Sequence, residues 1–336
     1  MVAEMTKAQW LPYLVERRGD HDVVRLIDVN RLDLNHAFLH HALEEATTQH
    51  LAQAIRLTTL PKWLNEQPEP DDNYSDFAAI FHVSRCGSTL LSHNISVAPN
   101  VISLNEPPFF RILRHRLDGT CSLDEALAIC LKVLACWRRW AASQGKRLVI
   151  KFNSQMHAYA HQLFSEMAGA RFVFLHRDPV AVLESLDRNP PSFLRSEAAQ
   201  ARFPVPPYLQ HVEAEPIAKA AAARFCATVD YFSRVEREDL LTVAYPQLAS
   251  RFSDILRHLR LDPDAVTKWS ATRYAKARKE NGDQLYVPVS AERMNRFTRQ
   301  NAHLVAVARG QYDKYLSAEK ARSLRATQST AADFLG

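Results

Sequence analysis

Short apolar runs alternate with longer amphipathic stretches over most of this chain. Five runs have no polar alternation and are typical of buried strands: 77–83, 101–104, 147–152, 171–176 and 240–245. The stretches between them carry apolar residues at helical spacing, near 89–98, 122–142, 155–168, 179–187 and 215–236. Buried strands that are separated by helices predict a parallel sheet with helices on both faces.

The first part of the chain has a different pattern. Residues 7–65 are predicted to be mainly helical, because "AFLHHALEEATTQHLAQAIRL" places its apolar residues on one side of a helix. The acidic, proline-rich "NEQPEPDDNYSD" at 65–76 interrupts this periodicity and marks a linker. The sequence thus predicts a helical extension over 1–70, a three-layer α/β domain over 71–320 and a tail over 321–336.

Composition indicates a globular protein. The chain has 336 residues, of which 47% are hydrophobic and 24% charged, enough to bury a full-sized core. Its first residues lack the apolar run of a signal peptide. The longest apolar tract, 127–137, is interrupted by Lys132 and is too short to span a bilayer. We therefore expect a cytoplasmic protein without membrane insertion.

Charge and cysteine content exclude some classes of partner. A net charge of +5 suits a small polyanionic ligand, but no dense run of Lys and Arg predicts nucleic-acid binding. The nearest candidate, "WRRWAASQGKR" at 137–147, is expected to be a solvated helix end. The five cysteines are scattered, without a CxxC pair, so we expect reduced thiols and no metal site.

The stretch "FHVSRCGSTLLS" at 81–92 passes from a strand into a helix, with Gly87 at the turn. The backbone N–H groups of such a turn and the dipole of the following helix favour an anion. Glycine suits a place where the backbone approaches a phosphate, because it has no Cβ. The alternative is that Gly87, Ser88 and Thr89 merely cap the helix.

This turn differs from the nucleoside-triphosphate loop GxxxxGK(S/T). Ser88 stands where that loop has its lysine, and His82 stands where it has its first glycine. The cation is Arg85, two residues before the glycine. The sequence therefore does not favour a nucleoside triphosphate as the ligand.

The turn resembles the 5′-phosphosulfate loop of the sulfotransferases that use 3′-phosphoadenosine 5′-phosphosulfate (PAPS), which have a P-loop fold. That family has a basic residue, a small residue, a glycine and two hydroxyl residues in this order. Cys86 departs from the usual serine, which removes one hydroxyl donor. The resemblance implies that the donor's phosphosulfate is bound by Ser84, Arg85, Cys86, Gly87, Ser88 and Thr89. We also expect alkylating reagents to modify Cys86, and bound adenosine 3′,5′-bisphosphate (PAP) to protect it.

A second strand end carries "HRDP" before a helix, in "FVFLHRDPVAVLESL" at 172–186. Sulfotransferases have here an arginine and, eight residues later, a serine that bind the donor's 3′-phosphate, which implies this role for Arg177 and Ser185. Residue 185 lies about two helical turns on, so its hydroxyl can face the same ligand. A surface ion pair of Arg177 with Asp178 or Glu184 is the alternative.

Two further strand ends supply a carboxylate and an amine. Glu106 follows the strand in "VISLNEPPFF", and Lys151 ends "LVIK". By resemblance to tyrosylprotein and carbohydrate sulfotransferases, Glu106 is the general base and Lys151 stabilises the transferring group, together with Arg85. Without that resemblance Glu106 is a loop charge and Lys151 a lysine at the sheet edge.

Two later segments are less specific. The basic "RYAKARKENGDQLY" at 273–286 resembles the family's closing loop and implies donor contacts for Lys276 and Lys279, although a solvated helix end fits equally well. The proline-rich segment 188–215 is either a lid over the acceptor or an irregular surface loop.

The resemblance implies a PAPS-dependent sulfotransferase that needs no metal and releases PAP. Its acceptor would be a small molecule, a peptide or a carbohydrate, and the residues do not decide among them. A metal-dependent phosphotransferase or NTPase is one alternative, and a non-catalytic module that binds PAP is another. The N-terminal region either shapes the acceptor pocket or mediates contacts between copies of the chain.

Overall fold

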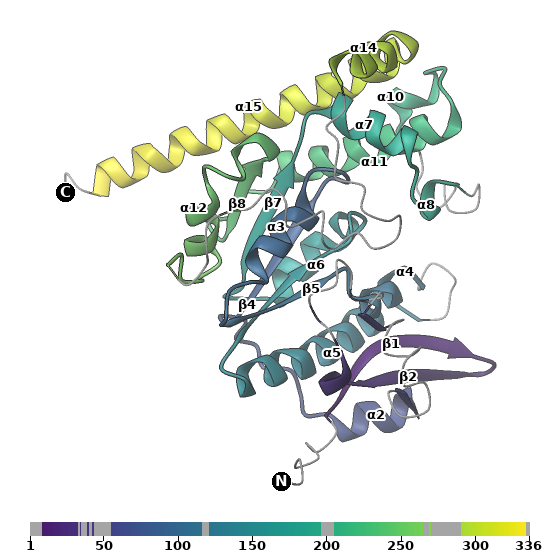
Figure 1. Cartoon of the computed structure of the whole chain (residues 1–336), viewed down its shortest axis with the longest axis vertical. Coiled ribbons are helices and arrows are strands. Elements are labelled where there is room, and N and C mark those ends of the chain that lie inside the picture. The colour runs from purple at the N-terminus through teal and green to yellow at the C-terminus, as the bar shows by residue number, and fades with distance from the viewer. Residues whose placement is uncertain are drawn as a thin grey trace.

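The molecule is built around a parallel β-sheet. The computed structural model describes residues 9–32, 34, 39, 42–43, 55–115, 121–195, 205–264, 269 and 290–333. Within these, five parallel strands lie in the order β5-β6-β4-β7-β8 (Figure 1). Their bounds are β4 (Phe77–His82), β5 (Val101–Asn105), β6 (Arg147–Lys151), β7 (Arg171–His176) and β8 (Leu240–Ala244). The five predicted strands and the α/β class are confirmed.

Helices cover both faces of this sheet (Figure 1). The longer ones are α3 (Ser88–Ile95), α5 (Leu123–Ser143), α6 (Ala160–Glu166), α7 (Pro179–Arg188), α11 (Pro216–Ser233), α12 (Phe252–His258), α14 (Ala291–Gln300) and α15 (Ala302–Asp333). On one face, Phe81 and Phe174 pack against the rings of Phe164 in α6 and Phe232 in α11. On the other face, α3 contacts β5, where the hydroxyls of Ser92 and Ser103 are 2.8 Å apart.

Residues 39 and 42–43 are helical, as predicted, but the helical extension predicted over 1–70 is wrong for residues 10–28 and 55–59. They form an antiparallel sheet of β1 (Trp10–Arg18), β2 (His21–Asp28) and β3 (Ile55–Thr59), followed by α2 (Leu60–Glu66). In β1, Leu11, Pro12, Tyr13 and Val15 are buried, and the alternation expected of a strand with one buried face is interrupted by an irregular pairing between Pro12 and Leu14. Most of the stretch with the helical pattern lies outside the described residues, and its end belongs to β3.

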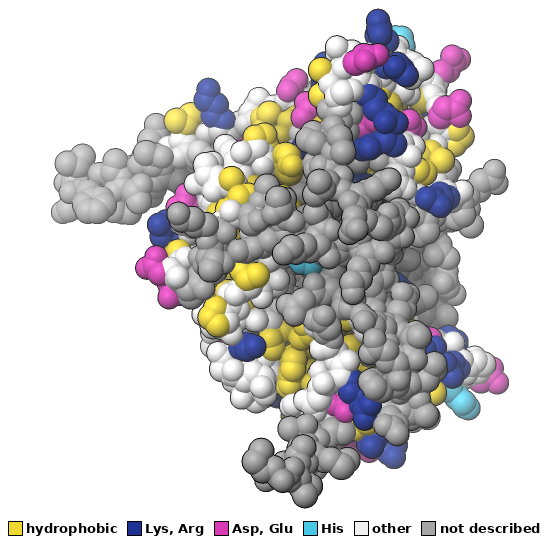
Figure 2. Space-filling view, in the orientation of Figure 1, with side chains coloured by type: hydrophobic (Ala, Val, Ile, Leu, Met, Phe, Trp, Pro, Cys, Tyr) yellow, Lys and Arg dark blue, Asp and Glu magenta, His cyan; other side chains and the backbone are white. Residues whose placement is uncertain are grey.

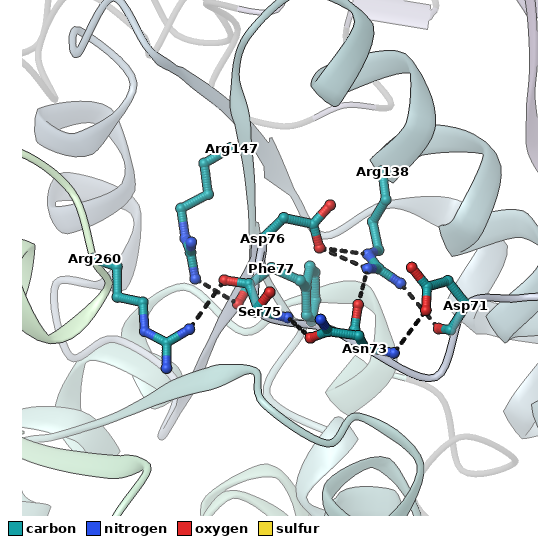
Figure 3. Close-up of polar contacts among 8 residues, drawn as sticks. All are labelled: Asp71, Asn73, Ser75, Asp76, Phe77, Arg138, Arg147 and Arg260. Atoms are coloured by element: carbon teal, nitrogen blue, oxygen red, sulfur yellow. Dashed lines mark hydrogen bonds and ion pairs between the residues drawn. The ribbon is translucent and has the colours of Figure 1, made fainter.

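The linker at 65–76 is fastened to α5 (Figure 3). The Arg138 guanidinium donates from Nε and Nη2 to Oδ1 of Asp76, at 2.9 and 2.6 Å, and lies 4.0 Å from the centre of the Tyr74 ring. Nearby, Lys132 pairs with Glu69 at 2.8 Å. Arg138 is only 5% exposed and anchors the linker, whereas residues 142–146 at the end of α5 are exposed, as predicted for a solvated helix end.

The predicted tail over 321–336 begins inside α15, which continues to Asp333. Arg322 fixes this helix by donating from Nη1 to the carbonyl oxygens of Phe232, Ser233 and Val235 at the end of α11. Within the described part of the chain, no helix has the length and apolar character needed to cross a membrane.

Candidate active site

The carboxyl ends of the five parallel strands meet at one edge of the sheet, where ligands bind in such folds. Following the sheet order, the residues at this edge are Glu106 after β5, Lys151 at the end of β6, the loop 84–87 after β4, Arg177 after β7 and Tyr245 after β8. The order therefore places a carboxylate and an amine on one side of the loop and an arginine on the other.

The loop after β4 ends in the first turn of α3. Gly87 is the N-terminal cap of this helix at φ 84°, and no side chain caps it. The N–H groups of a first helical turn have no acceptor within the helix. In α7, by contrast, Asp178 Oδ1 accepts from the N–H groups of Val180 and Ala181 at 2.9 and 3.2 Å. The start of α3 is thus suited to an external anion, whereas α7 has its own cap.

Gly87 is required by a neighbour that the sequence did not indicate. A Cβ at this position would lie 2.6 Å from Cδ2 and Cε2 of the Tyr245 ring. Tyr245 begins the short 3-10 helix η5 (Tyr245–Gln247), directly after β8. The glycine therefore allows Tyr245 to pack against the loop, and close approach of a ligand is not needed to explain it.

Gly87→Ala is expected to destabilise the fold through two separate effects. The left-handed backbone costs about 1–2 kcal/mol for an L-residue, and overpacking against the Tyr245 ring adds about 1–3 kcal/mol. Gly145→Ala is the matched control, because Gly145 has φ 66° and no atom within 4 Å of the added Cβ. Denaturant unfolding should show a clearly larger loss for Gly87→Ala, and equal losses would contradict this packing.

Lys151 connects the loop to the carboxylate. Its Nζ donates to Oε1 of Glu106 at 2.7 Å and to Oγ1 of Thr89 at 3.2 Å. The Lys151 side chain is 1% exposed and that of Glu106 is 29% exposed. A buried ammonium needs a charged partner, and the partly exposed Glu106 provides one. The structure thus brings Glu106 and Lys151, two of the three predicted catalytic residues, together.

Backbone geometry fixes the position of Glu106. Its N–H donates to the carbonyl of Lys151 at 2.7 Å, which extends the pairing of β5 with β6 by one residue. Glu106 adopts φ 51°, a left-handed conformation that is uncommon for a residue other than glycine. Such conformations are frequent where a side chain must point in a defined direction at a functional site.

Arg177 lies on the other side of the loop. Its Nη1 donates to the carbonyl of Arg85 at 3.0 Å, and its guanidinium lies 4.4 Å from the centre of the Tyr245 ring. Arg85, at φ 59°, donates from Nη2 to the carbonyl of Asn189 at 2.7 Å. The structure thus places Arg177 against both Arg85 and Tyr245, and sequence reasoning missed Tyr245 although it is the last residue of the predicted strand 240–245.

The carboxylates predicted as alternative partners of Arg177 have other roles. Asp178 caps α7, and the buried carboxylate of Glu184 pairs with Arg293 of α14 at 2.8 Å. Figure 2 shows Lys and Arg side chains gathered over α7 and α14. Ser185 is half-buried on α7. Lys276, Lys279 and part of the segment 188–215 lie outside the described residues.

Cys86 is not the reactive thiol that the sequence predicts. Its side chain is fully buried, and this burial raises its pKa to about 12. The thiol is small enough for the buried wall of the loop but does not reach solvent, so the expected alkylation is wrong.

Cys86 is therefore expected to stay unmodified by iodoacetamide in the folded protein near neutral pH, because only the thiolate reacts and the raised pKa keeps the thiol protonated. Half-buried Cys121 provides the internal comparison. Peptide mass spectrometry should show Cys86 labelled only in denaturant. Labelling of native protein as fast as that of Cys121 would contradict the burial.

Two more polar residues support the loop. Ser84 Oγ donates to Ser154 Oγ at 2.7 Å. His82 ends β4 and lies between two carbonyl oxygens, with Nδ1 2.9 Å from Val83 and Nε2 2.8 Å from Phe152. Burial lowers the pKa of His82 to about 4. In the described residues, no three His, Cys, Asp or Glu side chains form a group suited to a metal ion.

No protein-family model matches the sequence, and no curated protein matches it. Among solved structures, the sulfotransferase domain from the curacin biosynthetic pathway covers 70% of this chain and 98% of its own length, with 15% identity and a TM-score of 0.38. The sulfotransferase domain of the Synechococcus PCC 7002 olefin synthase covers 73% and 98%, with 17% identity and a TM-score of 0.40. A sulfotransferase from Alicyclobacillus acidocaldarius covers 69% and 95%, with 18% identity and a TM-score of 0.37. Both the identities and the TM-scores are low, so these structures carry no argument about the activity of this chain.

Proposed function

We propose that this protein is a sulfotransferase that transfers a sulfuryl group from PAPS to a hydroxyl or amine acceptor. One observation carries this proposal: the Lys151 ammonium bonds both to Thr89, in the first turn of α3, and to the Glu106 carboxylate. An anion-binding helix start, a cation and a base are thereby joined in one group at the edge of the sheet. Transfer of an anionic group to a protonated acceptor needs these three functions.

The residues present fit the donor. The uncapped first turn of α3 and the Ser88 and Thr89 hydroxyls offer neutral donors, and Arg85 offers a positive charge. These residues would hold the phosphosulfate, while Arg177 and Ser185 would hold the 3′-phosphate. PAPS, when bound, supplies the sulfuryl group and a phosphate that leaves with the bonding electron pair.

In the proposed reaction Glu106 accepts the proton of the acceptor as the acceptor oxygen or nitrogen bonds to sulfur. The bond from sulfur to the phosphate oxygen breaks at the same time. Lys151 offsets negative charge on the transferring group, and Arg85 with the N–H groups of α3 stabilises the leaving phosphate. Positioning and charge neutralisation are the main contributions of protein groups to such in-line transfers.

A module that only binds PAP would have no use for the Lys151–Glu106 pair. Burying an ammonium has a desolvation cost of several kcal/mol that the ion pair must offset. A site for binding alone could leave both groups in solvent. The buried Lys151 next to a partly exposed Glu106 therefore favours a catalytic role over simple binding.

Arg177→Ala is expected to weaken binding of PAP by about 10-fold to 100-fold, because a charge-assisted bond to a phosphate contributes about 1.5–3 kcal/mol. Binding of adenosine 5′-phosphosulfate, which has no 3′-phosphate, should change much less. Isothermal titration calorimetry of both nucleotides measures the difference. Arg257→Ala, an exposed arginine paired with Asp254, is the control. An equal loss of affinity for both nucleotides would show that Arg177 does not bind the 3′-phosphate.

A further inference from the structure

We propose that Arg147, Arg171 and Arg260 form a binding site for a divalent oxyanion such as sulfate or phosphate. Arg147 begins β6, Arg171 begins β7, and Arg260 follows α12. In a parallel sheet the strands start at the edge opposite to their carboxyl ends, so this site is separate from the candidate active site.

The strand register places two of the arginines on one face of the sheet. Val149 and Arg171 both lie opposite Ala78, and Arg147 precedes Val149 by two residues. Because side chains alternate along a strand, Arg147 and Arg171 project from the same face. Arg147 donates from Nη2 to the carbonyl of Phe77 at 3.1 Å.

Arg260 reaches the same short segment. It donates from Nη1 to the carbonyl of Ser75 at 3.3 Å. Figure 3 shows Arg147 and Arg260 approaching residues 75–77 from one side, while Arg138 approaches from the other. The segment before β4 is therefore the point on which these two arginines converge.

The three positive charges are not balanced by neighbouring carboxylates. Burial, and then the charges of Arg260 and Arg171, lower the pKa of Arg147 to about 10. The carboxylate of Asp76 acts in the opposite direction, but its Oδ1 accepts both bonds from Arg138. Among the residues that the structure describes, no carboxylate forms an ion pair with Arg147, Arg171 or Arg260.

One hydrogen-bond donor of Arg147 also has no acceptor. Nε of Arg147 is buried and has no acceptor, although most buried polar groups have one. Each guanidinium carries five N–H donors, and one bond each to the carbonyls of Phe77 and Ser75 uses few of them.

A purely structural clamp does not explain this arrangement. One arginine would hold the segment in place, whereas the half-buried Arg147 and Arg171 and the exposed Arg260 are like charges that repel one another. An oxyanion would neutralise the charges and accept the remaining N–H bonds, because the planar guanidinium matches the spacing of sulfate and phosphate oxygens. The geometry thus favours a bound anion at the start of the sheet.

Thermal unfolding in sodium sulfate, compared with sodium chloride at equal ionic strength, tests this site. Arg171→Gln and Arg260→Gln remove one donor group each and leave the half-buried Arg147 in place. Arg257→Gln on α12 is the matched control, since its guanidinium is exposed and already paired with Asp254. Arg177→Ala reports any sulfate bound at the candidate active site.

The proposal expects a sulfate-specific rise in Tm for the wild type, Arg257→Gln and Arg177→Ala. This rise should be lost in Arg171→Gln and Arg260→Gln, with at least about a tenfold weaker sulfate Kd by calorimetry. An equal rise in all variants, or no difference from chloride, would mean an adventitious ion only and overturn the site. A rise lost only in Arg177→Ala would place the sulfate at the active site and overturn it as well.

Discussion

Glu106→Gln is expected to lower turnover by about 100-fold to 10,000-fold, the usual contribution of a general base. Glutamine retains an oxygen that accepts the Lys151 bond, now 2.7 Å long, but it cannot take up the acceptor's proton. Binding of PAP should change little, because in the proposed site the base would face the acceptor and the donor phosphates would lie over α3. Steady-state turnover and calorimetry with PAP separate the two effects.

The chain offers a closely matched control for this substitution. Lys132 and Glu69 form a second Lys–Glu pair at 2.8 Å, far from the strand ends and with Glu69 82% exposed. Glu69→Gln removes the same charge by the same change of side chain. If Glu106→Gln turned over as fast as Glu69→Gln, Glu106 would not be the base.

Lys151→Met is expected to lower turnover by about 100-fold to 1,000-fold, as removal of one preorganised charge from a transition state does elsewhere. Stability should fall as well, because removing one partner of a buried pair leaves the Glu106 charge uncompensated, although Glu106 is 29% exposed and water can solvate part of it. Denaturant unfolding and steady-state turnover, measured on the same variant, separate the effect on stability from the effect on catalysis.

Lys132→Met is the control for Lys151→Met, since it breaks the surface pair with Glu69. Both substitutions remove one positive charge from the protein, so a general effect of net charge would appear in both. A similar, small loss of turnover in the two variants would show that Lys151 is a structural residue at the sheet edge.

The parallel sheet could be predicted because its strands are continuous apolar runs. A strand with helices on both faces has no solvent side, so no polar residue interrupts the pattern. In a parallel sheet, ligands bind at the edge formed by the carboxyl ends of the strands. Glu106, Lys151 and Arg177 could therefore be placed at this edge without knowledge of the strand order, because all five strands end there.

The N-terminal sheet could not be predicted in the same way. Its strands are joined through pairings such as Val23 with Thr59, which bring together residues distant along the chain. The apolar spacing before β3 predicts a helix, and the alternating pattern in β1 is too short to predict a sheet. A pairing of this kind depends on tertiary packing, which a local pattern does not contain.

The environment of the loop also depended on tertiary structure. The sequence indicates a small residue at Cys86 and a glycine at position 87, but not that the thiol is fully buried or that Tyr245 covers the glycine. Both facts follow from the order of the strands, which brings η5 beside the loop. The Lys151–Thr89 bond, which connects the helix start to the base, has the same origin.

The most direct test of the proposed donor is a thermal-shift titration of the wild-type protein with PAP, compared with ATP and Mg²⁺. A ligand that binds the native state raises Tm by an amount that grows with the logarithm of its concentration relative to Kd. A PAPS-dependent sulfotransferase should be stabilised by PAP and much less by ATP with Mg²⁺, because Ser88 replaces the lysine that holds the end phosphates of a triphosphate. Stabilisation by ATP and Mg²⁺ without any by PAP would contradict the proposal and favour a phosphotransferase.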